Sequence, residues 1–491
     1  LLIETLIIAV PGGIAGLALA IAGVRALIAG APADLPRLAE ISIDTTVLMF
    51  AFAMTLLTSI VFGLGPALQT ARTSANDLGR IGQRVAGGRG VRRGHQALVV
   101  GELALAQALL VGAGLLLVSF VHATQIDLGY GTTDRVLAEI NLAPDYIRPT
   151  GPNGAIDPAK KIRFIDTVID RVRAGQGVRA VAASSTAPLT GAPNRGMRIE
   201  GDPILPPEQQ PSADFQLITP EYFRALGITL VAGRAFAASD RADTPPVLIV
   251  NRSLADRYFP GRDPIGKVIV FGGTKRHQIV GVVADARYRS VERAADPTFY
   301  LPLEQNDERW PFLAFTVWTD GGAAARTAAA ALLRAAVRDA DPQQPISRLR
   351  TIEEMLSESM AARRFKTWIV GLFAATALLL AAIGTYGVMA FAVTSRTREL
   401  GVRAALGATP GELIGMVLRQ GLLLTIVAIG IGLVAALIVT RFMASMLFGV
   451  APRDPLTFAI VAIVLGTVAI AATLIPARRA MTVNPITALR D

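Results

Sequence analysis

Six long apolar stretches interrupt the polar sequence of this chain of 491 residues. They cover about residues 3–28, 47–70, 97–121, 367–393, 417–442 and 456–476. A helix rises about 1.5 Å per residue and needs roughly 20 apolar residues to cross the hydrocarbon layer of a membrane. The stretch 367–393 contains no charged residue. The pattern therefore predicts six membrane-spanning helices.

In the segment between the third and fourth apolar stretches, short runs of hydrophobic residues alternate with polar residues, as they do in a folded domain. Strand-like runs occupy 136–142, 178–185, 247–251, 268–271, 278–284 and 312–319. Helix-like runs, with apolar residues three and four positions apart, occupy 159–174 and 323–340. The mixture predicts an α+β domain over residues 122–366, in two lobes, which is large enough for a core of its own.

The net charge of +10 is concentrated beside the apolar stretches. Segments 71–96, 394–420 and 477–491 hold thirteen arginines and four carboxylates, and 13 minus 4 accounts for +9 of the +10. Basic residues flanking spans are typical of cytoplasmic loops, whereas a nucleic-acid-binding protein gathers them on one face. The charge pattern therefore places these segments in the cytoplasm, excludes nucleic acid as a partner, and puts 29–46, 122–366 and 443–455 outside.

Residue types that carry metal or thiol chemistry are scarce. The chain has no cysteine, and its three histidines, His95, His122 and His277, are far apart. Disulfides, thiolate metal sites and histidine metal sites are therefore not expected, and each histidine is interpreted as a surface residue. The outer domain also shows no nucleophile with a neighbouring base, so we expect no catalytic site.

Residues 261–267 have the G-x-x-x-x-G-K spacing of a phosphate-binding loop. Such a loop also needs a hydroxyl residue after the lysine to hold magnesium, and Val268 has none. Asp263 and Pro264 are typical of a turn. We interpret this segment as a surface turn, so the chain is expected to have no nucleotide site of its own.

The first and last pairs of apolar stretches are similar in sequence. Pro66 and Ala67 align with Pro476 and Ala477, and the segments after them stay in register. The repeat predicts a partial permease-type unit over 1–80 and a complete one after it. Because the first residue is not methionine, we expect the chain to be truncated. The predicted segments are 1–80, a basic linker 81–96, a span 97–121, the outer domain 122–366 and a membrane domain 367–491.

A charged segment, 394–415, separates two spans on the predicted cytoplasmic side. Arg396, Glu399 and Arg403 fall on one face of a helix, and small or apolar residues form the neighbouring face: Leu400, Ala404 and Gly407. Two interpretations remain open from the residues alone. The segment is either a docking helix for a soluble partner or a helix that lies along the membrane surface.

The residues after this segment carry a helix-start signal. Thr409, Pro410 and Glu412 have the spacing of a capping box with proline at the first helical position. A new helix is therefore predicted to begin at Pro410 and to continue into the next span.

Several long motifs resemble the FtsX-like, MacB-like permeases of ABC transporters, and among them the duplicated orphan class with two fused permease units. The motifs are LLVGAGLLLVSF, TPEYFRALGITLVAGRAF, VNRSLADRYFPGRDPIGK, AIGTYGVMAF, RTRELGVRAALGA and PARRAMTVNPITALRD. They follow one another in the family's order along most of the chain. The resemblance implies a membrane α-helical protein of six spans in the bacterial inner membrane, with a MacB-like periplasmic core domain.

The resemblance also implies a mechanism and partners. A separate ABC ATPase would bind ATP and dock on the cytoplasmic loop, and the membrane helices would then move the periplasmic domain in a dimeric or pseudo-dimeric arrangement. The residues implied in ATPase coupling are Arg396, Arg398, Glu399, Leu400, Gly401, Arg403, Ala405, Gly407 and Ala408. The residues of the family's C-terminal motif are Pro476, Ala477, Arg478, Arg479 and Pro485.

The resemblance implies no cofactor for this chain, because ATP would be bound by the partner subunit. Membrane lipid and a periplasmic adaptor or another envelope protein are further expected partners. One departure concerns the first unit, in which Leu68 and Gln69 stand where Arg478 and Arg479 stand in the second. The alternative function is that of an FtsX-like regulatory protein, which activates an envelope enzyme and moves no cargo.

Overall fold

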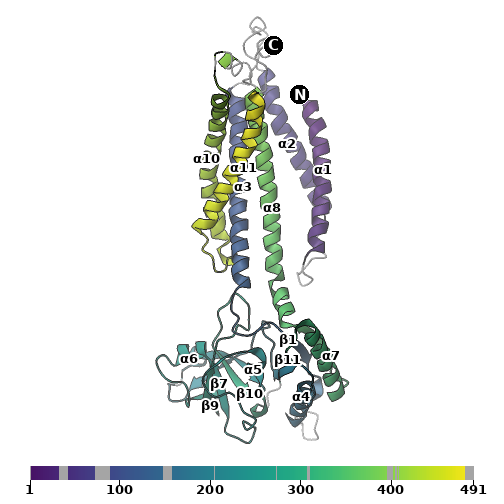
Figure 1. Ribbon diagram of the computed structural model, residues 1–491, viewed down its shortest axis with the longest axis vertical. Coiled ribbons are helices and arrows are strands. Elements are labelled where there is room, and N and C mark those ends of the chain that lie inside the picture. The colour runs from purple at the N-terminus through teal and green to yellow at the C-terminus, as the bar shows by residue number, and fades with distance from the viewer. Residues whose placement is uncertain are drawn as a thin grey trace. The chain divides into compact units, whose positions relative to one another are not determined.

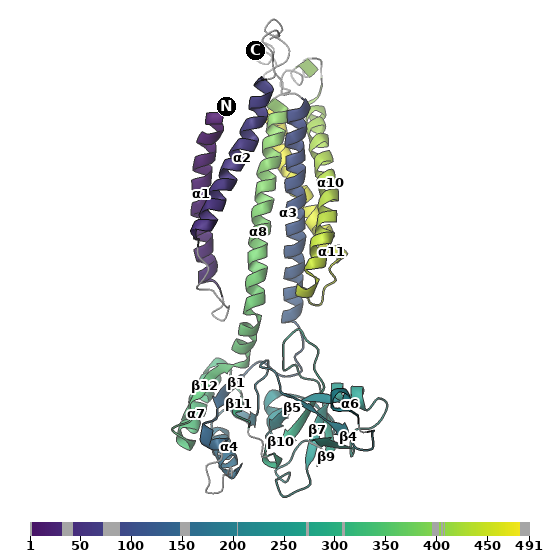
Figure 2. The same ribbon diagram turned by 180° about the vertical axis from the view of Figure 1, so that it is seen from behind.

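The computed structural model divides the chain into two compact units (Figures 1 and 2). The helical unit contains Leu1–Thr124 and Ala361–Asp491, and the outer unit contains Gln125–Met360. The structure describes residues 2–31, 43–71, 89–147, 158–203, 205–271, 274–306, 310–394, 402–403, 406 and 408–481. Each unit is described by itself below.

Six long helices coincide with the six predicted spans. They are α1 (Leu2–Ala29), α2 (Thr45–Ala71), α3 (Arg89–Thr124), α8 (Ile352–Thr394), α10 (Pro410–Phe442) and α11 (Pro455–Met481). Within the described residues, five of them are long and apolar enough to cross a membrane, namely all except α2. The described apolar part of α2 is Thr45–Leu57, so the second span stays a prediction.

The helical unit is held together by close packing of α3 against α10 and α11. Two clusters of buried small and aliphatic side chains fill the space between these helices: Val99, Leu103, Ala106, Ala381, Ala428 and Leu465 in one, and Ala108, Val111, Leu115, Ala436, Phe458 and Val461 in the other. Small residues allow helix backbones to approach closely, and this packing drives helix association in a membrane. Ala381 belongs to α8, so that helix contributes to the first cluster.

Threonine hydroxyls in the buried parts of these helices bond within their own helix. Thr385 donates to the Ala381 carbonyl at 2.7 Å, and Thr425 donates to the Gly421 carbonyl at 2.9 Å. A polar group without a partner in an apolar layer costs several kcal/mol, on the order of 2–7. These bonds explain how such hydroxyls lie inside spans.

The opening pair, α1 and α2, also consists of two helices in contact. Gly13 lies against Thr55, whose hydroxyl donates to the Ala51 carbonyl at 2.8 Å. The closing helices α10 and α11 likewise contact one another. The predicted duplication of the two pairs stays a prediction.

The outer unit is built on one mixed sheet of twelve strands in the order β12-β1-β11-β2-β5-β10-β7-β9-β8-β4, with β3 on β5 and β6 on β9. The first six strands are β1 (Arg135–Asn141), β2 (Val178–Ser184), β3 (Asn194–Gly196), β4 (Arg198–Ile199), β5 (Ser212–Ile218) and β6 (Leu230–Gly233). The other six are β7 (Val247–Asn251), β8 (Val268–Phe271), β9 (Lys275–Val283), β10 (Thr298–Pro302), β11 (Phe312–Thr319) and β12 (Ile346–Thr351).

Helices pack on both halves of this sheet, and α5 contacts both of them. α4 (Pro158–Arg173) and α7 (Gly322–Ala340) pack together on the half formed by β12, β1, β11 and β2. α6 (Arg252–Tyr258) contacts β7, β9 and β10 in the other half, and α5 (Tyr222–Leu226) contacts β2 and β11. The halves meet where β2 pairs with β5 at a single residue pair, Ser184 and Ile218. This arrangement agrees with the predicted two lobes.

The predicted strands and helices of the outer unit are confirmed to within a few residues. The predicted turn at 261–267 is also confirmed, because Gly261 and Gly266 have φ angles of 69° and 80° and the Ile265 amide donates to Asp263 Oδ1 at 3.0 Å. The expectation that every histidine lies at the surface is wrong for His277, which is 3% exposed. It lies on β9 with its ring edge against Phe271, at a centroid distance of 5.2 Å.

Candidate functional site

The predicted coupling segment is described in part, and its described residues form a helical turn. The Leu406 amide donates to the Val402 carbonyl and the Ala408 amide to the Arg403 carbonyl, both at 3.0 Å. The Leu406 side chain is 81% exposed, and that of Val402 is 41% exposed. The turn therefore presents two aliphatic side chains next to a basic one.

Most of the other predicted coupling residues lie outside the described residues: Arg396, Arg398, Glu399, Leu400, Gly401, Ala405 and Gly407. Arg403 is exposed, and its Nη1 lies 3.8 Å from the sulfur of Met416, which belongs to α10. The side-chain contacts that were predicted within 396–403 therefore stay predictions.

The C-terminal motif is described up to the end of α11. Pro476 and Ala477 are buried, Ala477 to 1% exposure, whereas Arg478 is exposed. Nothing is described of the Arg479 side chain, and Pro485 lies beyond the described residues. The motif thus begins as the last packed turns of the helical unit and continues into a basic surface residue.

The helix start after the coupling segment has the predicted capping box. The Thr409 amide donates to Glu412 Oε2 at 2.8 Å, and the Glu412 amide donates to Thr409 Oγ1 at 3.4 Å, with Pro410 in the first turn. These bonds satisfy amides that have no partner inside the helix. The cap fixes where α10 begins and hence where the coupling segment ends.

A polar cluster near the C-terminal end of α3 joins three parts of the helical unit. The Ser119 hydroxyl oxygen accepts from Arg363 Nη1 of α8 at 2.9 Å and from the Phe448 amide at 2.7 Å. His122 Nδ1 lies 3.1 Å from the Gly449 carbonyl oxygen. The α10–α11 connection is thereby tied to α3. Sequence analysis missed this cluster, because its members are hundreds of positions apart and each is an ordinary polar residue.

The outer unit contains a cavity of about 490 Å³ between its two sheet halves. Aromatic, hydroxyl and charged side chains line it, among them Glu139, Thr186, Arg289, Trp310, Phe312 and Arg348. These residues belong to segments far apart in the chain, so no local pattern predicts the cavity. Within the described residues, no cluster of side chains suits a metal ion.

Two family models together cover most of the chain. Residues 52–335 match the MacB-like periplasmic core domain, and residues 371–485 match the FtsX-like permease C-terminal domain. A membrane chain with these two domains in this order is an ABC transporter permease of the FtsX-like, MacB-like type. The chain belongs to the MacB-like periplasmic core domain family, and it is a multi-pass inner-membrane protein with a periplasmic domain.

Curated relatives extend this result. The macrolide export ATP-binding/permease protein MacB of Nitrosomonas europaea is 26% identical over 316 residues, which is 58% of this chain and 46% of that protein. The uncharacterized ABC transporter permease YknZ of Bacillus subtilis is 24% identical over 356 residues, which is 70% of this chain and 84% of that protein. The chain thus spans about half the length of the MacB relatives.

Solved structures with similar regions are periplasmic or extracellular domains. The periplasmic region of MacB from Actinobacillus actinomycetemcomitans matches 48% of this chain and 95% of that one, with 14% identity and a TM-score of 0.32. The extracellular domain of the transporter YknZ matches 44% of this chain and 98% of that one, with 14% identity and a TM-score of 0.30.

Proposed function

We propose that this permease couples ATP hydrolysis by a separate ABC ATPase to movement of its periplasmic domain, so that cargo is expelled or handed on outside the membrane. The observation that carries the proposal is the helical turn that contains Val402, Arg403 and Leu406, whose side chains are all exposed. Leu406 is 81% exposed beside the basic Arg403, immediately before the capped start of α10. An exposed aliphatic side chain next to a cation suits a groove on a soluble protein that has an apolar floor and an acidic rim.

Movement of α10 would reach α3 directly. The two helices share both buried clusters of the helical unit, and closely packed helices shift as bodies because their interior is densely packed. A displacement at residue 410 would therefore be transmitted along α10 and α3. The cap at Thr409 supports this role, since a fixed helix start transmits a push better than a frayed one.

The link to the periplasmic domain in this proposal is α8, which contains residues of both units. Its first turn is capped, with the Thr351 amide donating to Glu354 Oε2 at 2.8 Å. Arg350 then bonds Glu139 of β1 at 2.5 Å and also pairs with Glu358 of α8. These contacts fasten the start of α8 to the sheet of the outer unit.

The proposed assembly contains two permease units and two ATPase subunits, as in a dimeric or pseudo-dimeric transporter. ATP would be bound by the partner, and this chain would bind no cofactor. Relatives named for macrolide export make a macrolide one candidate cargo. A periplasmic adaptor is a further candidate partner.

The test is co-purification of the ATPase with the full chain and with two variants, Arg403→Glu and Leu406→Asp. Both changes lie on the exposed turn, so folding should persist while recovery of the ATPase falls about tenfold, since each places an acidic group on the docking face. The control is Arg338→Glu on α7 of the outer unit, an equal change of charge elsewhere. Unaltered recovery with both docking variants would contradict the proposal. Stimulation of ATP hydrolysis by cargo then separates transport from a purely regulatory role.

A further inference from the structure

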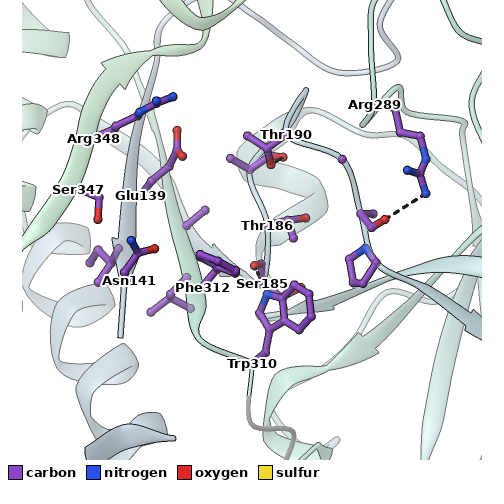
Figure 3. A pocket seen from close by; sticks show the side chains of 17 residues that line it. Glu139, Asn141, Ser185, Thr186, Thr190, Arg289, Trp310, Phe312, Ser347 and Arg348 are labelled. Carbon is purple, nitrogen blue, oxygen red and sulfur yellow. Dashed lines mark hydrogen bonds between the residues drawn. The ribbon is translucent and has the colours of Figure 1, made fainter. Parts of the chain in front are cut away.

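The cavity of the outer unit opens where strand β2 ends. β2 follows β11 in register as far as the pair of Ser184 and Ala314, and its single ladder pair with β5 is that of Ser184 and Ile218. The chain then turns away from β11, so residues 185–193 form one wall and β11 with β1 forms the other (Figure 3). The cavity is thus a product of the sheet topology.

Two aromatic side chains belong to the apolar part of the lining. Trp310 is held in place because its Nε1 donates to the Ser185 carbonyl oxygen at 2.7 Å. Phe312 packs edge-on against it, with ring centroids 5.9 Å apart, and remains 48% exposed. Figure 3 shows both rings on the same side of the cavity. An exposed phenyl group beside a fixed indole offers a flat apolar surface to a ligand.

One arginine at the cavity makes no ion pair among the described residues. Arg348 of β12 stands opposite Glu139 of β1 in the strand register, but the Glu139 carboxylate is bound by Arg350 at 2.5 Å. Among the described residues no carboxylate pairs with Arg348. On the other side of the cavity, Arg289 is already held by Asp214 at 2.7 Å and by Asp296 at 3.0 Å. Arg348 is therefore the cation that remains for a ligand.

We propose that this cavity binds an amphiphilic carboxylate, with an aromatic or alicyclic body against Trp310 and Phe312 and its anionic group at Arg348. The volume of about 490 Å³ fits a small organic molecule, since such sites commonly measure about 300–1,000 Å³. The site goes beyond the proposed coupling function and does not depend on the ATPase.

The test uses the full chain in lipid nanodiscs with Trp310 as the reporter. The chain has three tryptophans, so Trp318→Phe with Trp368→Phe leaves emission from Trp310 alone. The probes are 4-phenylbutyrate, 4-phenylbutanol and 4-phenylbutylamine, which share a body and differ in charge. We expect a saturable change of Trp310 emission, with the carboxylate bound about tenfold more tightly than the alcohol and the amine bound least.

Two variants separate the charged contact from the apolar one. Arg348→Ala should remove the preference for the carboxylate and leave the affinity for the alcohol unaltered. Phe312→Ala should weaken the binding of all three probes alike. Both side chains are exposed, so the fold is kept, and Arg338→Ala on α7 is the matched control. The proposal is overturned by the absence of a saturable signal, by equal affinity for carboxylate and amine, or by an unaltered preference in Arg348→Ala. ATPase recovery is expected to be the same in all these variants, so failure here is distinct from failure of the coupling proposal.

Discussion

Gln107 of α3 lies against Gly432 of α10, in the apolar interior of the helical unit. A Cβ atom at position 432 would stand 2.7 Å from the Gln107 Oε1 atom and 3.0 Å from the Ala104 carbonyl oxygen. Gln107 is fully buried, and within the described residues its amide has no hydrogen-bond partner. The two helices therefore approach as closely as they do because residue 432 has no side chain.

Gly432→Val should separate α3 from α10. The added methyl groups meet backbone as well as side-chain atoms, and overpacking of this kind costs about 1–3 kcal/mol. The measurement is the thermal unfolding midpoint of the purified protein, which should fall. The matched control is Gly430→Val, one half-turn away on the same helix, where a Cβ has nothing within 4 Å. Equal midpoints for the two variants would show that the close approach does not matter.

Thr409→Ala should loosen the start of α10. It removes the hydroxyl that accepts from the Glu412 amide, and loss of an N-cap costs about 1 kcal/mol. Hydrogen exchange at the amides of residues 411–413 should become faster, and ATPase-coupled activity should fall. Thr409→Ser keeps the hydroxyl and should behave as the parent protein. Faster exchange in both variants would assign the effect to packing of the threonine methyl group instead.

Asp240→Asn should destabilise the outer unit at neutral pH. Arg234 donates to both carboxylate oxygens, at 2.7 and 2.9 Å, and the Ala237 amide donates at 2.8 Å. The hydrogen bonds from Arg234, then that from Ala237, hold the pKa of Asp240 below its ordinary value against the opposing effect of burial. The expected loss is about 1–2 kcal/mol, because Arg234 is half exposed.

The pH dependence of this pair follows from the direction of its shift. A carboxyl group with a pKa lowered by folding stabilises the fold above its unfolded pKa of about 3.9, and the contribution is lost as the pH falls through the folded pKa. The difference in unfolding midpoint between the parent and Asp240→Asn should therefore be full at pH 7 and shrink as the pH falls below about 4. Asp243→Asn, at an exposed position of the same loop, is the control. A difference independent of pH would rule out the ion pair as its source.

Tyr288→Phe should destabilise the outer unit and flatten its alkaline pH profile. The Tyr288 hydroxyl lies 3.0 Å from that of Tyr222 and 3.3 Å from that of Tyr300, and burial raises the pKa of Tyr288 well above its ordinary value. Removing the central hydroxyl leaves two buried ones without this bond, at a cost of about 1–3 kcal/mol.

The contribution of Tyr288 to stability changes with pH in the opposite direction to that of Asp240. A phenol whose pKa is raised by folding stabilises the fold below its unfolded pKa of about 10, and the contribution is lost as the pH rises above it. Unfolding midpoints measured from pH 8 to 11 should therefore fall less steeply in Tyr288→Phe than in the parent. Tyr258→Phe, at a partly buried tyrosine of α6 whose hydroxyl donates to the Ser212 carbonyl, serves as the comparison. Identical slopes would contradict the burial of an un-ionised phenol.

The sequence predicts those elements whose pattern is local. Long apolar runs locate the spans, short apolar runs locate β7 and β11, and the capping box follows from Thr409 and Glu412 alone. The short strands β3, β4 and β6 have too few residues for a period to show. Their existence depends on pairing with β5, β8 and β9, which no local pattern contains.

The candidate sites also differ in whether a local sequence pattern predicts them. The coupling segment was predicted from charge spacing and family resemblance, and its contacts over 396–401 remain predictions. The cavity was not predicted, because it needs Trp310 to lie beside Ser185, 125 positions away. The burial of His277 was missed for a similar reason, since β9 lies between β7 and β8 in the sheet and is covered on both edges.

The narrow junction between the two halves of the sheet has a mechanical consequence. One ladder pair, Ser184 with Ile218, joins β2 to β5, and two backbone hydrogen bonds flank it, from the Ser185 amide to the Leu217 carbonyl and from the Thr219 amide to the Ala183 carbonyl. Torsion about this junction would strain these few backbone hydrogen bonds, and it would be resisted by the packing of Phe223 of α5 against Tyr300 of β10. Such a hinge would widen or narrow the binding cavity as the halves rotate, so pulling on one half would alter the affinity for whatever molecule sits between them.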